Sequence, residues 1–219
     1  MASKLLRKNS SRPVAQSSSV RSARQRILDV AIPLFYQEGA RAVGIDTIIA
    51  KSGVAKMSLY RSFRSKDELI AACLEERDKS YWQWFDGVVA QHPDEPREQL
   101  RGVIRGIAKR TSNPGYRGCI FLNTATDYAA PWHPGRKLAV RHKQTLASRL
   151  LKICRQLAVR DPVALSRQLV LLINGAQATA GMLGKKTQME LIAAAEQLTS
   201  GAKGTAEIAP RQTAIRRRA

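Results

Sequence analysis

The sequence predicts an all-α protein of about nine helices. Apolar residues recur at spacings of three and four along most of the chain, which is the pattern of a helix with one buried face. No segment shows the alternating pattern and tight turn of a β-hairpin, and no internal repeat is found. Of the 219 residues, 44% are hydrophobic, which is enough for an ordinary buried core.

The first three predicted helices are close together in the sequence. The first begins near Arg21 and continues for about 18 residues. It contains Pro33, where we expect a kink or a cost of up to about 3 kcal/mol. The second is expected at about 45–52, ended by Gly53, and the third at about 56–63.

The fourth predicted helix has the clearest start. Ser65 and Glu68 have the spacing of a capping box, in which each side chain satisfies a backbone N–H at the helix terminus. The apolar periodicity then reaches about Ala90. We therefore expect one long helix from this cap.

Proline and glycine divide the rest of the chain into five more predicted helices. Asp161 and Pro162 have the form of a helix start, and the helix that follows is apolar nearly all round, which predicts burial on several sides. The five helices are expected at about 97–110, 119–128, 135–159, 162–183 and 186–200.

The charge favours an anionic partner. The chain has 37 Lys and Arg against 17 Asp and Glu, a net charge of +20, which favours nucleic acid or an acidic membrane surface. No apolar run approaches the roughly 18 residues of a membrane span, and the N-terminus has no apolar signal core. We expect a cytoplasmic protein with no membrane partner.

About half of the excess charge lies near the two ends of the chain. Residues 1–20 mix lysine, arginine and serine without apolar periodicity, and we expect a disordered basic arm there and a disordered basic tail at 202–219. The arm is either a solvated tail or a segment that neutralises phosphates or enters a minor groove.

The cysteines and histidines do not form a recognisable catalytic or metal site. Cys73, Cys119 and Cys154 lie far apart and outside any metal-binding spacing, so we expect buried thiols, no metal and no cofactor. Redox sensing at Cys119 is the open alternative. Cys119 with His133 or His142 is the one conceivable catalytic dyad, and we expect no enzyme.

The second and third helices have the form of a helix-turn-helix, in which the second helix enters the major groove of DNA. Gly53 can adopt the positive φ that the turn requires, and Val54 can anchor the turn to the core. The exposed face of the third helix is then Lys56, Met57, Ser58, Tyr60 and Arg61.

Residues 53–69, GVAKMSLYRSFRSKDEL, together with Ile48, resemble the DNA-binding domain of TetR-family transcriptional regulators. The resemblance is strong over about 21–70 and extends by helix order over the rest. It implies an all-helical homodimer, usually a repressor, with a C-terminal domain that binds a small molecule. The expected domains are then a helix-turn-helix domain at 21–66 and a helical regulatory and dimerisation domain at 67–201.

The resemblance also implies roles for residues of the first domain. Tyr60 and Lys66 would contact phosphates, while the other predicted DNA-binding residues would face bases or adjacent phosphates: Thr47, Lys56, Met57, Ser58 and Arg61. Gly44, Ala55 and Met57 depart from the residues frequent in the family. Ala55 cannot form a side-chain cap, which costs about 1 kcal/mol, and Met57 offers an apolar contact to a thymine methyl group.

The second domain is expected to contain a ligand pocket and a dimer contact. Aromatic and polar residues give the predicted pocket for a small apolar or aromatic ligand: Trp82, Phe85, Ile104, Phe121, Asn123, Tyr128, Asn174 and Gln177. The alternative is that these aromatic residues are simply core. Apolar and small residues of the last two helices give the predicted dimer contact: Leu169, Leu172, Ala176, Ala180, Leu191 and Ala195.

These observations predict a sequence-specific transcriptional regulator. We expect a repressor that leaves a palindromic operator in double-stranded DNA when an unidentified small-molecule effector binds. The alternative is a sequence-neutral architectural DNA-binding protein, because a net charge of +20 attracts any duplex. Preference for one palindrome over random DNA at the same salt concentration separates the two.

Overall fold

The computed structural model describes residues 21–184 and 186–201, and this part of the chain is all-helical, as predicted. The predicted basic arm at 1–20 and basic tail at 202–219 lie outside the described residues. Among the described helices, none is both long and apolar enough to cross a membrane. The helices are α1 (Ala23–Glu38), α2 (Ile45–Ser52), α3 (Lys56–Ser62), α4 (Lys66–Ala90), α5 (Pro96–Thr111), α6 (Ile120–Asp127), α7 (Pro134–Cys154), α8 (Pro162–Leu183) and α9 (Lys186–Gly201).

The predicted order of helices is confirmed, and α7 contains the main error in a boundary. It ends at Cys154, not at about Val159. After it, the N–H of Gln156 bonds to Ile153 at 3.0 Å and that of Leu157 to Cys154 at 3.1 Å, which is tighter turn geometry. Leu157 is nevertheless buried. The apolar periodicity therefore continues past the point where the α-helix stops.

The first three helices enclose a small core of their own. Ile27 and Ile48 are fully buried between them, and Leu59 and Phe63 are 1% exposed. Gly53 adopts φ 62° and its N–H bonds to Ile49 at 3.1 Å, so the left-handed turn predicted between α2 and α3 is confirmed. Helix α1 continues through Pro33, whose side chain is exposed.

The start of α4 shows the predicted cap in a modified form. The Ser65 hydroxyl accepts a hydrogen bond from the N–H of Glu68 at 3.1 Å. The Glu68 carboxylate accepts one from the N–H of Arg64 at 2.8 Å, one residue earlier than in the standard motif. Both bonds fix the direction in which α4 leaves the first three helices.

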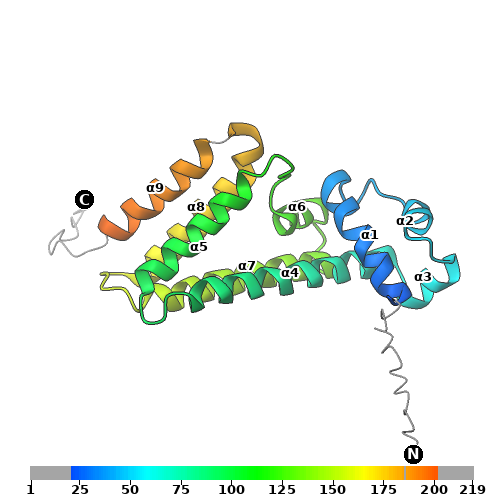
Figure 1. Ribbon diagram of the computed structural model, residues 1–219, viewed down its shortest axis with the longest axis horizontal. Coiled ribbons are helices and arrows are strands. Elements are labelled where there is room, and N and C mark those ends of the chain that lie inside the picture. The colour runs from blue at the N-terminus through cyan, green and yellow to red at the C-terminus, as the bar shows by residue number, and fades with distance from the viewer. Residues whose placement is uncertain (1–20, 185, 202–219) are drawn as a thin grey trace, which may run out of the picture.

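Two buried clusters follow each other along α4. The first combines α1–α3 with the start of α4, with α6 and with Leu138 and Ala139 at the start of α7. The second combines the far half of α4 with α5, α8, α9 and the end of α7. Figure 1 shows α4 and α7 lying along each other, with α6 next to α1. Residues just beyond the boundary predicted at 66/67 belong to the first cluster, and the division into two domains stays a prediction.

Helices α4 and α5 approach closely at two glycines one turn apart. A Cβ at Gly102 would lie 2.8 Å from Cγ1 of Val88, and a Cβ at Gly106 would overlap the indole of Trp84. The indole therefore occupies the space that a side chain at 106 would need.

Replacing Gly106 with alanine should destabilise the fold by about 1–3 kcal/mol, because the indole must leave its position. The matched Gly87→Ala substitution on α4 adds a Cβ that meets nothing within 4 Å, so its higher helix propensity should stabilise the protein by up to about 1 kcal/mol. Urea unfolding measures both. Two effects of the same sign would contradict the close packing at Gly106.

Candidate functional site

The exposed face of α3 carries the residues predicted to read DNA. Met57 is 70% exposed and Tyr60 44% exposed, and Lys56 and Arg61 are also exposed. Ser58 is half-buried. On the opposite side, Leu59 anchors the helix in the core. Helix α3 thus presents a mixed basic and apolar surface. An α-helix fits the major groove of DNA.

Helix α2 lies beside this surface. Thr47 is exposed, and the Lys56 ammonium is 3.9 Å from the carboxylate of Asp46 on the same helix as Thr47. Because both partners of the pair are largely exposed, it contributes little, and Lys56 is free to exchange it for a phosphate or base. Gly44 and Ala55, the caps of α2 and α3, make no side-chain hydrogen bond, as predicted.

Lys66 has a partner within the chain. Its ammonium donates a hydrogen bond to the carbonyl of Arg41 at 3.1 Å, which ties the loop after α1 to the start of α4. Partial burial lowers the pKa of Lys66, and the neighbouring Asp67 opposes that effect. A cation is unfavourable at a helix N-terminus, and the carbonyl compensates for this. Lys66 thus bonds within the chain in this structure, and its phosphate contact stays a prediction.

A cavity of about 490 Å³ lies between the end of α1 and helices α4, α5 and α6. Its wall is formed by the end of α1, by α4, α5 and α6, by the loop between α5 and α6, and by single residues of α7 and α8. Of the predicted pocket residues, Phe121 and Gln177 line it. The full lining is Tyr36, Gln37, Arg77, Ser80, Tyr81, Ile107, Arg110, Thr111, Asn113, Gly115, Tyr116, Gly118, Cys119, Ile120, Phe121, His142 and Gln177.

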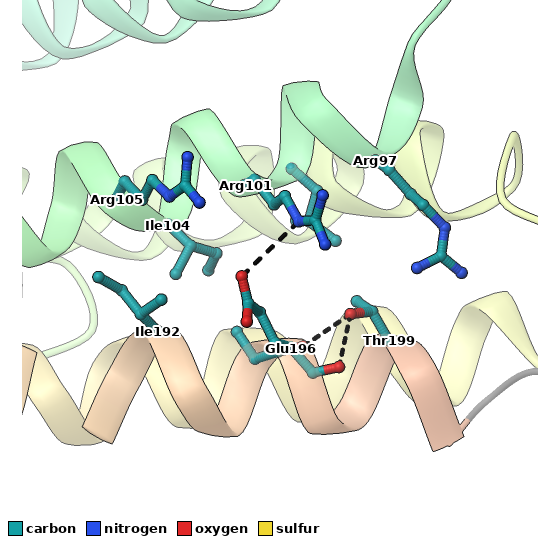
Figure 2. A pocket seen from close by; sticks show the side chains of 9 residues that line it. Arg97, Arg101, Ile104, Arg105, Ile192, Glu196 and Thr199 are labelled. Carbon is teal, nitrogen blue, oxygen red and sulfur yellow. Dashed lines mark hydrogen bonds and ion pairs between the residues drawn. The ribbon is translucent and has the colours of Figure 1, made fainter. Parts of the chain in front are cut away.

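The other predicted pocket residues lie elsewhere. Asn123 lines a neighbouring cavity of about 260 Å³ between α1, α4 and α6. Ile104 borders a narrow groove between α5 and α9, where Figure 2 shows Arg101 reaching toward Glu196. Phe85 is 3% exposed within the second buried cluster.

Three predicted pocket residues are engaged in packing and hydrogen bonds. The Trp82 indole donates to Asp78 at 2.7 Å, and the Tyr128 ring stacks on His133 at 4.0 Å. The amide oxygen of Asn174 accepts from Lys143 at 2.8 Å. These three side chains lie outside the lining of the cavity, and their part in ligand binding stays a prediction.

His142 and Tyr81 also line the cavity. The His142 ring stacks on Phe121 at 3.7 Å, and its Nδ1 is 2.7 Å from the Asp78 carboxylate. Burial lowers the pKa of His142 to about 4 despite the hydrogen bond with Asp78, and the charge of Lys143 lowers it as well. The imidazole is therefore neutral. Tyr81 is 8% exposed, and its hydroxyl has no hydrogen-bond partner among the described residues.

Hydrogen bonds connect the cavity wall directly to α1. We call α1–α3, which share one core, the DNA-reading unit. The Tyr36 hydroxyl, at the end of α1, accepts from the N–H of Arg117 at 2.9 Å and donates to the carbonyl of Gly118 at 3.3 Å. The Arg117 guanidinium donates to the carbonyl of Gln37. We call these contacts the α1 latch. They connect α1 to the loop that closes one side of the cavity.

The predicted dimer residues are mainly internal. Leu169, Ala176, Ala180, Leu191 and Ala195 are at most 7% exposed, and Leu172 is half-buried. Side chains buried within one protomer offer little surface to a second. Exposed apolar and small residues on the same two helices include Leu171, Gly175, Ala178 and Met182 on α8 and Met189 and Ala193 on α9.

The three cysteines are free and buried, as predicted. Burial raises the pKa of Cys73 to about 12 and that of Cys154 to about 11. A thiol reacts as its thiolate, so these two side chains are poor nucleophiles near neutral pH. Both thiols therefore fit a role in packing of the core.

The comparisons with known proteins agree on one family. The family model for bacterial regulatory proteins, tetR family, matches residues 27–73. The chain is 32% identical to SCO4454, a TetR-family transcriptional regulator from Streptomyces coelicolor, covering 83% of this chain and 96% of that one with a TM-score of 0.80.

Two more distant likenesses cover most of the chain. It is 20% identical to the HTH-type transcriptional regulator YjdC of Escherichia coli K12, covering 69% of this chain and 80% of that protein. The reduced form of NemR from E. coli has a TM-score of 0.71 at 18% identity, covering 80% of this chain and 95% of that one. The likeness to NemR shows the fold alone.

The buried His142 should make stability depend on pH. A histidine in an unfolded chain has a pKa of about 6.5, while that of His142 in the fold is lowered to about 4. Between these values the unfolded state binds more protons, so stability should fall as the pH is lowered through this window. Imidazole NMR follows the titration directly, and urea unfolding at about pH 7 and about pH 5 measures the loss. Titration of His142 near its unfolded value would contradict the assignment.

Proposed function

The chain belongs to the TetR family of DNA-binding transcriptional regulators, and we propose that it acts in the cytoplasm as a homodimeric repressor of a near-palindromic operator. In this proposal, a small molecule in the cavity of about 490 Å³ releases the DNA. The observation that carries it is the α1 latch, because it makes the wall of the cavity and the DNA-reading unit mechanically continuous.

The face of α3 supports sequence-specific reading. We assign base contacts to Lys56, Met57 and Ser58 and phosphate contacts to Tyr60, with Arg61 able to reach either. Met57 is the most informative of these, since an apolar side chain that is 70% exposed distinguishes a thymine methyl group from other base edges. Lys66 stays a proposed phosphate contact that must release the Arg41 carbonyl.

The proposed dimer surface is the exposed apolar face of α8 and α9. Positions 171, 175, 178 and 182 follow one another at helical spacing, and Leu171 and Met182 are 72% and 77% exposed. Met189 on α9, at 64%, continues the apolar character. Small residues between the large ones allow close approach of a second copy. A two-fold axis here would use the same face of both protomers.

The proposed release follows from the position of the cavity. A ligand that changes the loop at 115–118 also changes the partners of Tyr36 and Gln37, and therefore the setting of α1. In a dimer, this alters the spacing of the two α3 helices. A tenfold loss of operator affinity requires about 1.4 kcal/mol of differential ligand affinity between the two arrangements.

Selection of bound sequences from random DNA tests the proposal against a sequence-neutral architectural role. A regulator should select one inverted repeat, with half-sites about one helical turn or somewhat more apart. An architectural protein with a net charge of +20 should bind duplexes alike, with affinity set by salt.

Met57→Ala should change the preferred base at one position of each half-site, by about 1–3 kcal/mol of discrimination. Tyr60→Phe removes a hydroxyl assigned to phosphate and should weaken all sequences alike. Binding measured at one salt concentration over a set of single-base operator variants separates the two effects. The role assignment fails if Tyr60→Phe reorders the sites and Met57→Ala does not.

Leu171→Asp should raise the dissociation constant of the dimer by at least about tenfold, because the symmetric interface would bury the charge twice. Val140→Asp on α7 is the matched control, since Val140 is also exposed but lies outside the proposed surface. Sedimentation equilibrium measures both. Equal dissociation of the two variants would place the interface elsewhere.

A further inference from the structure

We propose that the effector is an organic anion, with an apolar body in the cavity and a carboxylate or similar oxyanion held by Arg110 and the Tyr81 hydroxyl. The proposal rests on the proposed function only in taking this cavity as the effector site. It replaces the purely apolar or aromatic ligand expected from the sequence.

The charge of the lining is one-sided. Arg77 and Arg110 line the cavity, and no aspartate or glutamate does. Within the described ranges, neither guanidinium has a carboxylate at ion-pair distance. Each lies over an aromatic ring instead, Arg110 at 3.9 Å from the centroid of Trp84 and Arg77 at 5.5 Å from that of Tyr36.

The two guanidinium groups are close enough to influence each other. Burial lowers the pKa of Arg110, and the charge of Arg77 lowers it further. Both residues are exposed to solvent, and two neighbouring cations favour an anion between them. Arginine also offers two parallel N–H donors to a carboxylate, a geometry that a single ammonium lacks.

The Tyr81 hydroxyl is a hydrogen-bond donor that has no acceptor among the described residues. It is buried and makes no hydrogen bond, an arrangement that costs stability unless a partner is supplied. Burial raises the pKa of Tyr81, so the hydroxyl keeps its proton and can donate it. The Arg110 guanidinium lies 5.5 Å from the Tyr81 ring centroid and both residues line the cavity, so we place one anionic group between them.

The acceptors in the lining are largely occupied. The side-chain oxygen of Gln177 accepts from Lys143 at 3.0 Å, and its backbone carbonyl accepts from Tyr116 at 3.2 Å. The side-chain oxygen of Asn113 accepts from the N–H of Gly115 at 3.0 Å. No hydrogen bond from the amide N–H groups of Gln177 or Asn113 is found among the described residues, so both can donate to a ligand. With the two guanidinium groups, the lining therefore offers several donors to acceptor atoms of a ligand.

The rest of the wall accommodates an apolar body. Ile107 and Phe121 are buried residues, and Cys119 and Ile120 continue the apolar lining. One face of the Phe121 ring is covered by His142, so the ring is held in position. A volume of about 490 Å³ lies within the range of small-molecule sites. The lining thus favours a ligand with one anionic end and an apolar remainder.

Matched pairs of probes test the anion directly. The full-length protein is titrated without DNA by calorimetry, at fixed ionic strength, with 2-naphthoate against 2-naphthamide and with 4-phenylbutanoate against 4-phenylbutanamide. At least one carboxylate should bind about tenfold or more tightly than its amide, because a hydrogen bond to a charged group is the stronger one. If no carboxylate binds more tightly than its amide, the proposal is overturned.

Substitutions test which residue causes the preference for the carboxylate over the amide. Arg110→Gln should reduce the carboxylate preference by about tenfold. The matched Arg105→Gln substitution, on the same helix with the same change in charge, alters a residue of the groove in Figure 2 and should leave the preference unchanged. Equal losses in the two variants would mean diffuse attraction to a basic protein and would overturn the site.

Tyr81→Phe provides a second, independent check. It should weaken the carboxylate several-fold while leaving the melting temperature of the free protein unchanged or raised, because it removes an unpartnered buried hydroxyl. A lower melting temperature with unchanged carboxylate affinity would contradict the role of Tyr81. Operator binding is then measured with and without the bound carboxylate. Preferential binding through Arg110 with no effect on DNA would establish the cavity as an anion site and refute its proposed role in regulation.

Discussion

The structure depends on α4 being one continuous helix. Near its start it contributes Leu69, Ile70 and Leu74 to the core around the DNA-reading helices, and further along it contributes Tyr81 and Phe85 to the second core. Because α4 is continuous, packing of its side chains in one core constrains their packing in the other core. No flexible linker separates the two cores. The α1 latch closes the same connection through a second route. Reading unit and cavity are parts of one packed body.

Signals confined to a few adjacent residues predicted their structures well. The left-handed Gly53, the Ser65 cap and the missing side-chain cap at Ala55 depend only on adjacent residues, which the sequence specifies. The end of α7 was wrong because Leu157 continues the apolar periodicity while its backbone has left the α-helix. Periodicity reports burial, and burial does not require a helix.

The pocket and dimer residues needed information that no local pattern contains. Trp82, Phe85 and Asn174 were expected near a ligand and lie outside the lining of the cavity, while Arg110, which no local pattern indicated, lies within it. An aromatic residue on a buried face contacts either a neighbour or a void, and the relative rotation of packed helices decides which. The same limit separates buried Ala176 and Ala180 from exposed Gly175 and Ala178, since one residue along a helix turns the side chain by about 100°.

The close approach at Gly106 links packing to selectivity. The missing side chain there makes room for the Trp84 indole, and the Arg110 guanidinium lies over that indole at 3.9 Å. Positions 84 and 106 should therefore covary among related chains, with a large ring opposite glycine and a smaller side chain opposite alanine. Evolution could shift the guanidinium, and with it the preferred effector, by exchanging residues that never touch a ligand.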